Sequence, residues 1–596
     1  MLHKSFSKLK IPKIQKKTRL FWSIFLMFMI GIFILEKKFF LAHSHIVPDK
    51  GGIYTESTIG TVKNLNPLAL DSSLFDRDLQ HLIFEGLLRY NSLTGKIEDG
   101  LGKLTVKNPK TYDVTIKENA QFQDGSKVTV DDVLFTFGSV IQNPNFKNQI
   151  LSQKFEYVSF QVLDDKTIEF SLPEPNSFFP SLLTTPILPQ KYFKKAFIEE
   201  ITDSNYPFNK NPIGTGPYRL KNLVPNLDGS FRVFLEKNKY YYRGVPKIDQ
   251  IVFYVYPNMD QLNEEKDSRT IFSNLVPEWE SKFEAKLNQQ YPQKYEKKEF
   301  FLPRFVGVFF NLDSNFGKNI ALRKAMNLAL DKKEILAKEN GWQEMNSFFF
   351  FEGVDNPSMP PRYTEAVNLL KNSNFSYNEN KKIMQFDGQP VILNMITSIA
   401  PPIYSRFAQS MVRRWEDELK IKINLQILSS DEFGKALEKR DYDIVLFGEN
   451  FAKNFDTFSL WHSSESGKYN LSNLTNKDVD FSIEEIKNTG IRSEITELNK
   501  SLNEITPGIP IATPKNVLFV DKKLKNFDET FGGNKLRAHD QRFDGIEQWY
   551  FFEKRGWDYP AGQSKFLGFF KWLFGQETKT PTPPAASPSL PDGTKK

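Results

Sequence analysis

The period of the hydrophobic pattern changes repeatedly along the chain, and this predicts strands that alternate with helices. Residues 79–86 place apolar side chains at helical spacing, whereas residues 112–116 alternate apolar and polar side chains as a half-buried strand does. The Asp-Gly pair at 124–125 is a turn signal, and Thr129 then caps a predicted helix that extends to residue 141. A strand, a turn and a helix in this order favour a mixed α/β fold.

The same alternation returns in the second half of the chain, after a proline-rich crossing at 166–192 that predicts irregular extended structure. A buried-strand pattern at 305–313 precedes a helical face at 320–336, and strand and helix patterns then alternate as far as residue 447. Two strand-like segments, at 507–520 and 543–553, end the folded part. These blocks predict a second, separate α/β lobe.

An uncharged apolar segment, Leu20–Leu35, follows a basic stretch that contains no acidic residue. The segment is shorter than the roughly 20 apolar residues of a spanning helix, but snorkelling lysines at its end can extend it. Charged residues follow where signal-peptide cleavage needs small ones, so we expect an uncleaved anchor. The positive-inside tendency predicts a cytoplasmic segment at 1–19, a single-pass transmembrane signal-anchor at 20–41, a linker at 42–52 and a body on the extracytoplasmic side, periplasmic or cell-surface.

The charge of the chain indicates a membrane rather than a nucleic-acid partner. The formal net charge is +7, from 79 basic and 72 acidic residues, and residues 1–19 hold seven of the basic ones. Without those seven the chain has 72 residues of each sign, so the body lacks the basic excess of a nucleic-acid-binding protein. The absence of cysteine excludes disulfides, thiolate metal sites, a cysteine nucleophile and a lipid-modified cysteine anchor.

The sequence contains no recognisable catalytic or cofactor motif. The six histidines form no HExxH or other catalytic spacing, there is no GxSxG, and the glycines around residue 215 lack the rest of a phosphate-binding or dinucleotide-binding motif. We therefore expect no enzyme activity, no cofactor and no metal site. An exported hydrolase that uses a pair of carboxylates stays an alternative, because acidic residues are abundant and counting them does not exclude it.

Several motifs, taken in order, resemble one protein family. They are FEGLLRYN at 84–91, YDVTIKENAQFQDGSKVTVDDVLFTF at 112–137, NPIGTGPY at 211–218, LRKAMNLALDKKEI at 322–335 and RDYDIVLFGENF at 440–451. The series resembles the extracellular solute-binding proteins of family 5, which are the oligopeptide- and dipeptide-binding receptors of ABC transporters. The resemblance covers residues 53–555, nearly all of the predicted exported part.

This resemblance implies a two-lobed α/β fold of periplasmic-binding-protein class II, with an inserted subdomain and a cleft that closes by hinge bending. Lobe I is expected at 53–305 and 506–560, with the inserted subdomain at 66–210, and lobe II at 306–505. A peptide-like solute would lie between the lobes as an extended strand and pass to the permease of an ABC importer. We expect a monomer.

The resemblance also indicates where the solute binds. Family members have an acidic residue after a D-x-x-x-x-GW stretch that receives the amino group of the peptide. This chain has Glu449 in place of the aromatic residue and Ala452 at the acidic position, so Glu449 or Asp456 is the substitute. The predicted ligand-binding residues are Gly448, Glu449, Asn450, Phe451, Asp456 and Trp461.

Some of these residues also have structural interpretations. Trp461 fits core packing, and the acids near it fit helix capping. The motif residues Gly214, Gly216, Pro217 and Tyr218 are interpreted as structural, because glycines allow a tight backbone where the chain enters a strand near the hinge.

The altered motif at 448–456 leaves a second hypothesis open, a receptor of the same fold for a metal chelate, haem or an oligosaccharide. A surface scaffold is a further alternative. The aromatic segment 564–575 suits an interfacial helix on a bilayer, a docking element for the transporter, or a helix packed on lobe I. The Pro/Ser/Thr-rich tail at 577–596 is predicted to be disordered.

Overall fold

The chain forms two compact units, which we describe from a computed structural model. The described residues are 16–275, 280–352, 354–451, 457–490, 493–557, 569 and 571–573. One unit is the body, Gly51–Tyr550, and the other joins the two ends of the chain, Met1–Lys50 with Phe551–Lys596. Asp456, the start of the basic segment, most of the aromatic segment and the tail lie outside the described residues.

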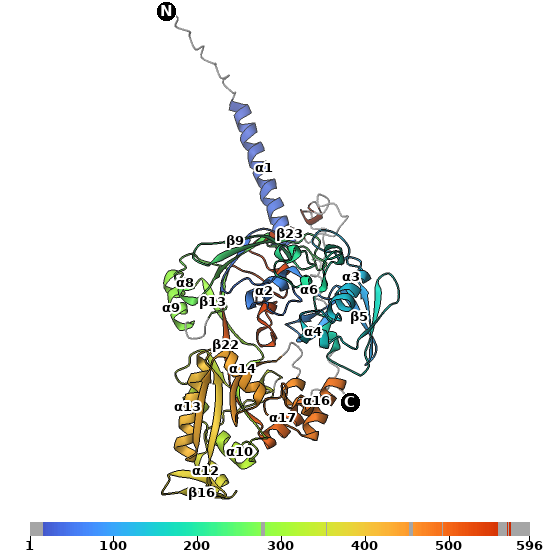
Figure 1. Cartoon of the computed structure of the whole chain (residues 1–596). Helices are drawn as coiled ribbons and strands as arrows, with labels where there is room; N and C mark the ends of the chain where they lie inside the picture. Colours follow the sequence, from blue (N-terminus) through green and yellow to red (C-terminus); the bar gives the residue numbers. More distant parts are fainter. Residues whose placement is uncertain are drawn as a thin grey trace, which may run out of the picture. The chain divides into compact units, whose positions relative to one another are not determined.

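A 12-stranded sheet runs through the body (Figure 1). Ten strands follow one another in the order β20-β19-β21-β14-β22-β12-β2-β11-β10-β9, and β13 and β15 pair with β22 beside that path. The strands are β2 (Ile53–Ile59), β9 (Tyr218–Pro225), β10 (Phe231–Lys237), β11 (Gln250–Tyr256), β12 (Ile271–Ser273), β13 (Tyr295–Phe301), β14 (Arg304–Phe310), β15 (Trp342–Glu344), β19 (Ile392–Ser398), β20 (Lys422–Leu428), β21 (Ile444–Asn450) and β22 (Gly508–Asp521).

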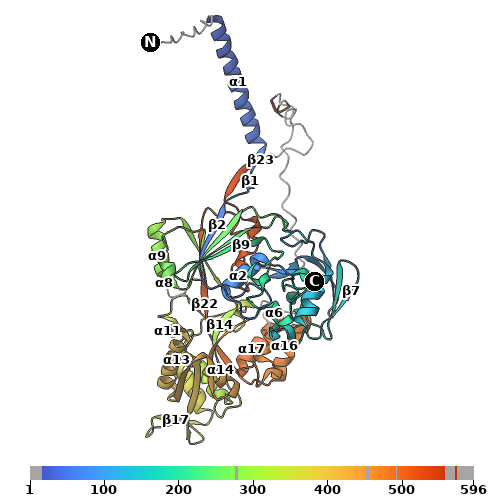
Figure 2. The ribbon, with the colours of Figure 1, turned by 45° about the horizontal axis from the view of Figure 1, so that its top comes forward.

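Strand β22 connects two halves of this sheet. Its residues 508–512 pair with β14, and its residues 515–521 pair with β13. We call the half around β2 and β9–β13 lobe I (51–303 and 516–550) and the half around β14 and β19–β21 lobe II (304–515). Figure 2 shows β14 and β22 where the two lobes meet. The predicted two-lobed α/β fold is therefore confirmed.

Lobe I adds two smaller sheets to the main one. The predicted helix cap at Thr129 is confirmed. The side chain of Thr129 accepts a hydrogen bond from the backbone N–H of Asp132, and the side chain of Asp132 caps Thr129 in return. The elements here are β3 (Leu88–Asn91) with β4 (Lys96–Asp99); β5 (Gly102–Asn108), β6 (Thr111–Ile116), β8 (Thr167–Ser171) and β7 (Ser159–Val162); and helices α2 (Leu74–Ile83), α3 (Val130–Leu134), α4 (Gln149–Gln153), α5 (Phe179–Leu182), α6 (Ile198–Ile201), α7 (Pro207–Lys210), α8 (Met259–Asn263) and α9 (Glu280–Gln290).

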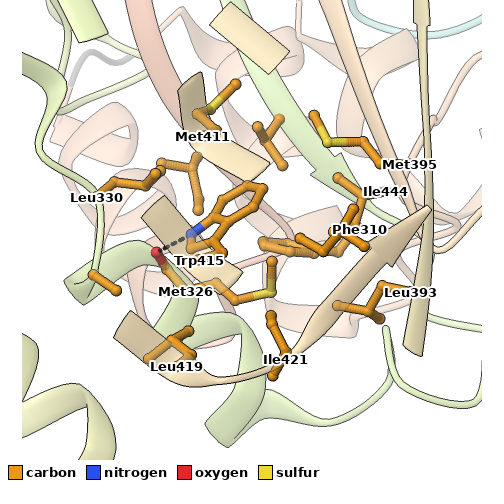
Figure 3. Packing of buried hydrophobic residues seen from close by; sticks show 14 of the residues in the cluster. Phe310, Met326, Leu330, Leu393, Met395, Met411, Trp415, Leu419, Ile421 and Ile444 are labelled. Atoms are coloured by element: carbon orange, nitrogen blue, oxygen red, sulfur yellow. Dashed lines mark hydrogen bonds between the residues drawn. The ribbon is translucent and has the colours of Figure 1, made fainter. Parts of the chain in front are cut away.

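The core of lobe II packs helices against the sheet around Trp415 (Figure 3). Trp415 is fully buried, and its indole Nε1 donates a hydrogen bond to the carbonyl oxygen of Met326 at 2.8 Å. The helical face predicted at 320–336 enters this core. The elements are α10 (Ile320–Leu328), α11 (Lys332–Leu336), α12 (Tyr363–Lys371), α13 (Ile403–Leu419), α14 (Ser430–Lys439), α15 (Phe458–Trp461), α16 (Lys477–Thr489), α17 (Ser493–Ile505) and a small sheet of β16 (Phe375–Asn378), β17 (Ile383–Phe386) and β18 (Gln389–Pro390).

The two ends of the chain form the second unit by pairing with each other. Helix α1 (Lys16–Ala42) leads into β1 (Ser44–Asp49), which pairs antiparallel with β23 (Phe552–Trp557). Near the end of α1, the buried ring of Phe39 packs on Phe569 and Trp572, with ring centroids 5.5 and 5.4 Å apart. Among the helices that the structure describes, none combines the length and the apolar content needed to cross a membrane.

This pairing corrects two predicted boundaries. Residues 44–49, which we expected within the linker 42–52, form a strand, and residues 552–557, which we expected in lobe I, pair with that strand outside the body. The hydrophobic pattern could not reveal this strand, because Ser44–Asp49 has few apolar residues and its partner lies at the other end of the chain.

Candidate functional site

The junction between the lobes collects the ends of several strands. Strand β22 runs from lobe II into lobe I, and β12 is antiparallel to it. Because β2 is parallel to β12, β2 runs in the opposite direction to β22 and ends toward lobe II. Strand β21 is antiparallel to β14, and its last residue, Asn450, pairs with Arg304, where β14 begins. The segment after β2 and the end of β21 therefore both lie at the junction. Ligands of open α/β sheets bind outside the carboxyl ends of strands.

Glu449 places a carboxylate without a partner at this end of β21. It pairs with Phe305 across the sheet, next to Phe451, and within the described part of the chain its carboxylate makes no hydrogen bond or ion pair. Burial raises the pKa of Glu449 from 4.5 to about 7. A partly buried carboxylate of this kind gains a partner when a cationic group binds beside it.

Tyr404 and Arg304 lie near the same strand end. A Cβ atom at Gly448 would overlap the hydroxyl of Tyr404, so the glycine allows that hydroxyl to approach the strand. Arg304 donates from Nη2 to Oδ1 of Asn516 at 3.0 Å, while its buried Nε lacks an acceptor among the described residues. Burial raises the pKa of Tyr404 and lowers the pKa of Arg304. The strand end thus combines an unpartnered acid with an incompletely bonded cation.

Two of the predicted contact residues belong instead to the core of lobe II. Trp461 is fully buried against Phe309 and Phe348, with ring centroids 5.7 and 5.0 Å away. Phe451 is 7% exposed and packs on Phe305. Core packing accounts for both rings in this structure, and their contact with a solute stays a prediction.

The GTGPY residues have a structural role, but not near the hinge. Gly214 and Gly216 lie against the end of α2, where a Cβ atom at either position would overlap backbone carbonyl oxygens. The N–H of Gly216 donates to the carbonyl of Ile83 at 2.8 Å. Pro217 and Tyr218 lead into β9, which is the edge strand of the sheet at the lobe I end. The expected position near the hinge is therefore wrong.

A cavity of about 340 Å³ opens in lobe I. Its walls come from the segment after β2, from α2, from the FEGLLRYN motif and from a polar segment at 538–547. All of its lining residues belong to lobe I, and α2, which forms one wall, begins beside Gly60, just after β2 ends toward lobe II. Its charged lining residues are Arg77, His81, Glu85, Arg89, Arg243, Asp540, Asp544 and Glu547.

His81 links α2 to the polar segment across this cavity. Its ring nitrogens lie 3.2 Å from Oδ2 of Asp540 and 3.1 Å from Oδ1 of Asp544. Burial opposes the charge of the ring, but the hydrogen bonds to the two carboxylates outweigh it and raise the pKa of His81 to about 9. His81 is therefore a cation at neutral pH and neutralises much of the acidic charge beside it.

A buried ion-pair network holds the polar segment in place next to this cavity. The guanidinium of Arg542 binds both carboxylate oxygens of Asp78, at 2.5 and 2.7 Å, and Oε1 of Glu56 at 2.8 Å. All three side chains are fully buried. Since Asp78 lies on α2 and Glu56 on β2, this network fixes the segment to both elements.

The sequence pattern does not reveal this cavity, because its walls come from segments far apart in the chain. One signal was present in the run AHDQRFD at 538–544, a polar stretch close to a strand-like one. Such a run usually forms a solvated loop, whereas His539 to Asp544 are all buried here. A buried polar run must find partners inside the protein, and those partners form the cavity.

A contact away from the connecting strands also joins the two lobes. The backbone N–H of Ser177 donates to the carbonyl of Lys487 at 2.7 Å, and its hydroxyl donates to the carbonyl of Ile486 at 3.0 Å. Ser177 belongs to lobe I, and both carbonyls belong to the last turn of α16 in lobe II. Separation of the lobes would break both hydrogen bonds.

The described residues contain no cluster of three or more histidine or acidic side chains that could hold a metal ion. Two α/β lobes joined by connecting strands, with charged groups at the junction, define a receptor that encloses a solute by lobe closure. Residues 103–470 match the model for bacterial extracellular solute-binding proteins, family 5, middle region. The chain belongs to this family, as its motifs indicated.

Curated relatives cover most of the chain at low identity. The oligopeptide-binding protein AppA of Bacillus subtilis is 22% identical over 520 residues, which is 84% of this chain and 92% of AppA. The nickel-binding protein NikA of Staphylococcus aureus is 22% identical over 75% of this chain and 86% of its own length. The periplasmic oligopeptide-binding protein OppA of Salmonella typhimurium is 23% identical over 65% of this chain and 72% of OppA.

Solved structures show the same fold. AppA of Bacillus subtilis in complex with a nonapeptide matches with a TM-score of 0.62 and 20% identity, over 85% of this chain and all of that one. NikZ of Campylobacter jejuni in complex with Ni(L-His) gives 0.62 and 20% over 84% of this chain and 99% of NikZ. NikA of Brucella suis in complex with Fe(III)-EDTA gives 0.67 and 16% over 84% of this chain and all of that NikA.

Proposed function

We propose that this protein is an extracytoplasmic receptor that encloses an oligopeptide between its lobes and delivers it to an ABC importer without chemical change. The observation that carries the proposal is the strand end at the junction, where, among the described residues, Glu449 has no cationic partner and the Nε of Arg304 has no acceptor. A peptide has an ammonium group and a carboxylate, so it satisfies both. The names of AppA and OppA, both oligopeptide-binding proteins, support this choice of solute.

A metal chelate is the second candidate solute. NikZ binds Ni(L-His) and the NikA of Brucella suis binds Fe(III)-EDTA, and both share the fold of this chain. A chelate of this type carries carboxylate groups that Arg304 would contact. The family consists of solute-binding receptors rather than enzymes, so both candidates imply capture without turnover.

Native mass spectrometry of the full-length chain, released from membranes in mild detergent, tests this function. We expect the protein to retain a ladder of short peptides whose masses vanish after unfolding and refolding. Their sequences then give the length preference. Retention of a chelated metal in place of peptides would establish the second candidate, and an empty protein that also ignores a mixed peptide library and metal–histidine complexes would contradict both.

We also propose that α1 attaches the body to a membrane. Support comes from the large apolar side chains of this helix, of which Trp22 is 58% and Phe28 63% exposed. The exposed Lys17 and the basic residues before it would favour an anionic membrane surface. Exposed apolar surface of this extent marks an interaction site.

Membrane fractionation tests this attachment. We expect the wild-type chain to sediment with membranes after washing with alkaline carbonate, and the double variant Ile24→Asp, Phe28→Asp to stay in the soluble fraction. The matched control is Leu227→Asp, which changes a fully exposed apolar residue in lobe I. Release of the wild-type chain by carbonate would show that α1 binds only at the membrane surface. Sedimentation of the double variant would show that another part of the chain makes the attachment.

A further inference from the structure

The acidic side chains that line the lobe I cavity all have partners. Asp540 and Asp544 share the cation of His81. Glu85 accepts hydrogen bonds from the hydroxyls of Tyr241 and Tyr242, and Glu547 pairs with Arg243 at 3.0 Å. Each of these acids therefore already has a cationic or hydroxyl partner.

The donors that line the same cavity are not all used. Arg77 on α2 makes no side-chain hydrogen bond or ion pair with any described residue. Among the described residues, Arg89 pairs only with Glu98, at 3.6 Å, and that carboxylate already accepts hydrogen bonds from Asn91 and Thr94. The cavity thus holds one guanidinium without a partner and one with a distant partner.

Gln541 adds a third donor. Its Oε1 accepts hydrogen bonds from the backbone N–H groups of Arg537 and Ala538, at 2.7 and 3.1 Å, which assigns the other end of the amide as nitrogen. That nitrogen donates to none of the described residues, although the side chain is only 2% exposed and lines the cavity. A buried donor of this kind is costly unless a ligand or water accepts its hydrogen bond.

We propose that the lobe I cavity is a subsite for a carboxylate group of the solute, bound by Arg77, Arg89 and Gln541. Guanidinium groups bind carboxylates with paired hydrogen bonds, and the amide nitrogen supplies a further donor. Arg77 lies near the start of α2, which packs on Gly60 where β2 ends toward lobe II, so a solute held at the junction would reach the cavity from the Arg77 side. This inference rests on the proposed receptor function and states which chemical group of the solute, a carboxylate, lobe I would bind.

Matched probes distinguish the sources of the carboxylate. Native mass spectrometry of the full-length chain would compare random short-peptide pools with free or amidated C-termini, amidated pools with Glu or Gln at one position, and EDTA with its tetramethyl ester. The variants are Arg77→Met and Arg89→Met. The control is Arg219→Met, which removes an exposed arginine of β9 that pairs with Glu236 outside the cavity.

We expect the wild type and Arg219→Met to prefer at least one carboxylate probe over its neutral match by about tenfold or more. Arg77→Met and Arg89→Met should reduce that preference to about twofold or less while keeping the binding of neutral probes. Because Arg77 is exposed, its variant should fold even if the Arg89 variant does not. An unchanged preference in the Arg77 variant, or no preference in the wild type, would overturn the subsite.

The outcome separates this inference from the peptide function. Binding of EDTA that depends on the arginines, with no peptide pool bound, supports the carboxylate subsite and overturns the peptide receptor. Binding of peptides without any carboxylate preference supports the receptor and overturns the subsite. If no probe binds in any arm, both are overturned.

Discussion

Replacing Arg542 by methionine is expected to lower the free energy of unfolding by about 3–5 kcal/mol. The substitution leaves Asp78 and Glu56 buried without their cation, and both are fully buried on different elements of lobe I. Urea unfolding of the full-length chain, followed by tryptophan fluorescence, measures the loss. Trp549, which is fully buried two residues after that segment, contributes to this emission.

The matched control for this prediction is again Arg219→Met. Arg219 forms an ion pair with Glu236, but its side chain is 46% exposed, so its removal should change stability by less than about 1 kcal/mol. Equal effects of the two substitutions would contradict the importance of the buried network. A triple replacement of Arg542, Asp78 and Glu56 by apolar residues should recover part of the lost stability, because it removes the uncompensated charges.

Replacing Glu449 by glutamine is expected to have no effect on stability near pH 4 and to raise the free energy of unfolding by up to about 3 kcal/mol above pH 8. The pKa of Glu449 is about 7 in the folded protein, against 4.5 for the ordinary group. The neutral acid therefore fits the fold better than the carboxylate. The stability that neutral Glu449 contributes is fully present below about pH 4.5 and is lost as the pH rises through 7. Glutamine does not ionise, so the variant does not lose stability in this way.

Thermal unfolding of the ligand-free full-length chain across this pH range measures the effect. The control is Glu504→Gln, which changes an exposed acid at the end of α17 in the same lobe and should follow the wild-type pH profile. A Glu449→Gln profile parallel to that of the wild type would show that Glu449 ionises normally. A bound solute with an ammonium group should reduce the difference, because it gives the carboxylate a partner.

The local elements were predictable from the sequence, whereas the position of one element against another was not. Thr129 caps its helix because its neighbours in the chain supply every group that the cap needs. Glu449 could be singled out because an acid replaces an aromatic residue in a family motif. The strand Ser44–Asp49 and the cavity around His81 both depend on residues hundreds of positions away, and periodicity does not show such pairs.

The sequence does not show which of the candidate ligand-binding residues are buried in the core and which are available to a solute. Trp461 and Glu449 follow the same motif, and only the structure shows that the ring of Trp461 is enclosed by Phe309 and Phe348 while the carboxylate of Glu449 has no partner. The donors of the lobe I cavity could not be predicted, because an arginine in a sequence does not reveal whether its partner is already used.

The pairing of β1 with β23 also determines when the protein can finish folding. Ser44–Asp49 leaves the ribosome before the body is made, but its partner, Phe552–Trp557, is made only after the whole body. During synthesis and export, β1 therefore exposes an open strand edge, and such edges pair readily with other chains. The body, Gly51–Tyr550, is a compact unit without this pair of strands. A chain interrupted before Phe552 would lack β23, so β1 would keep an unpaired strand edge even if the body had folded.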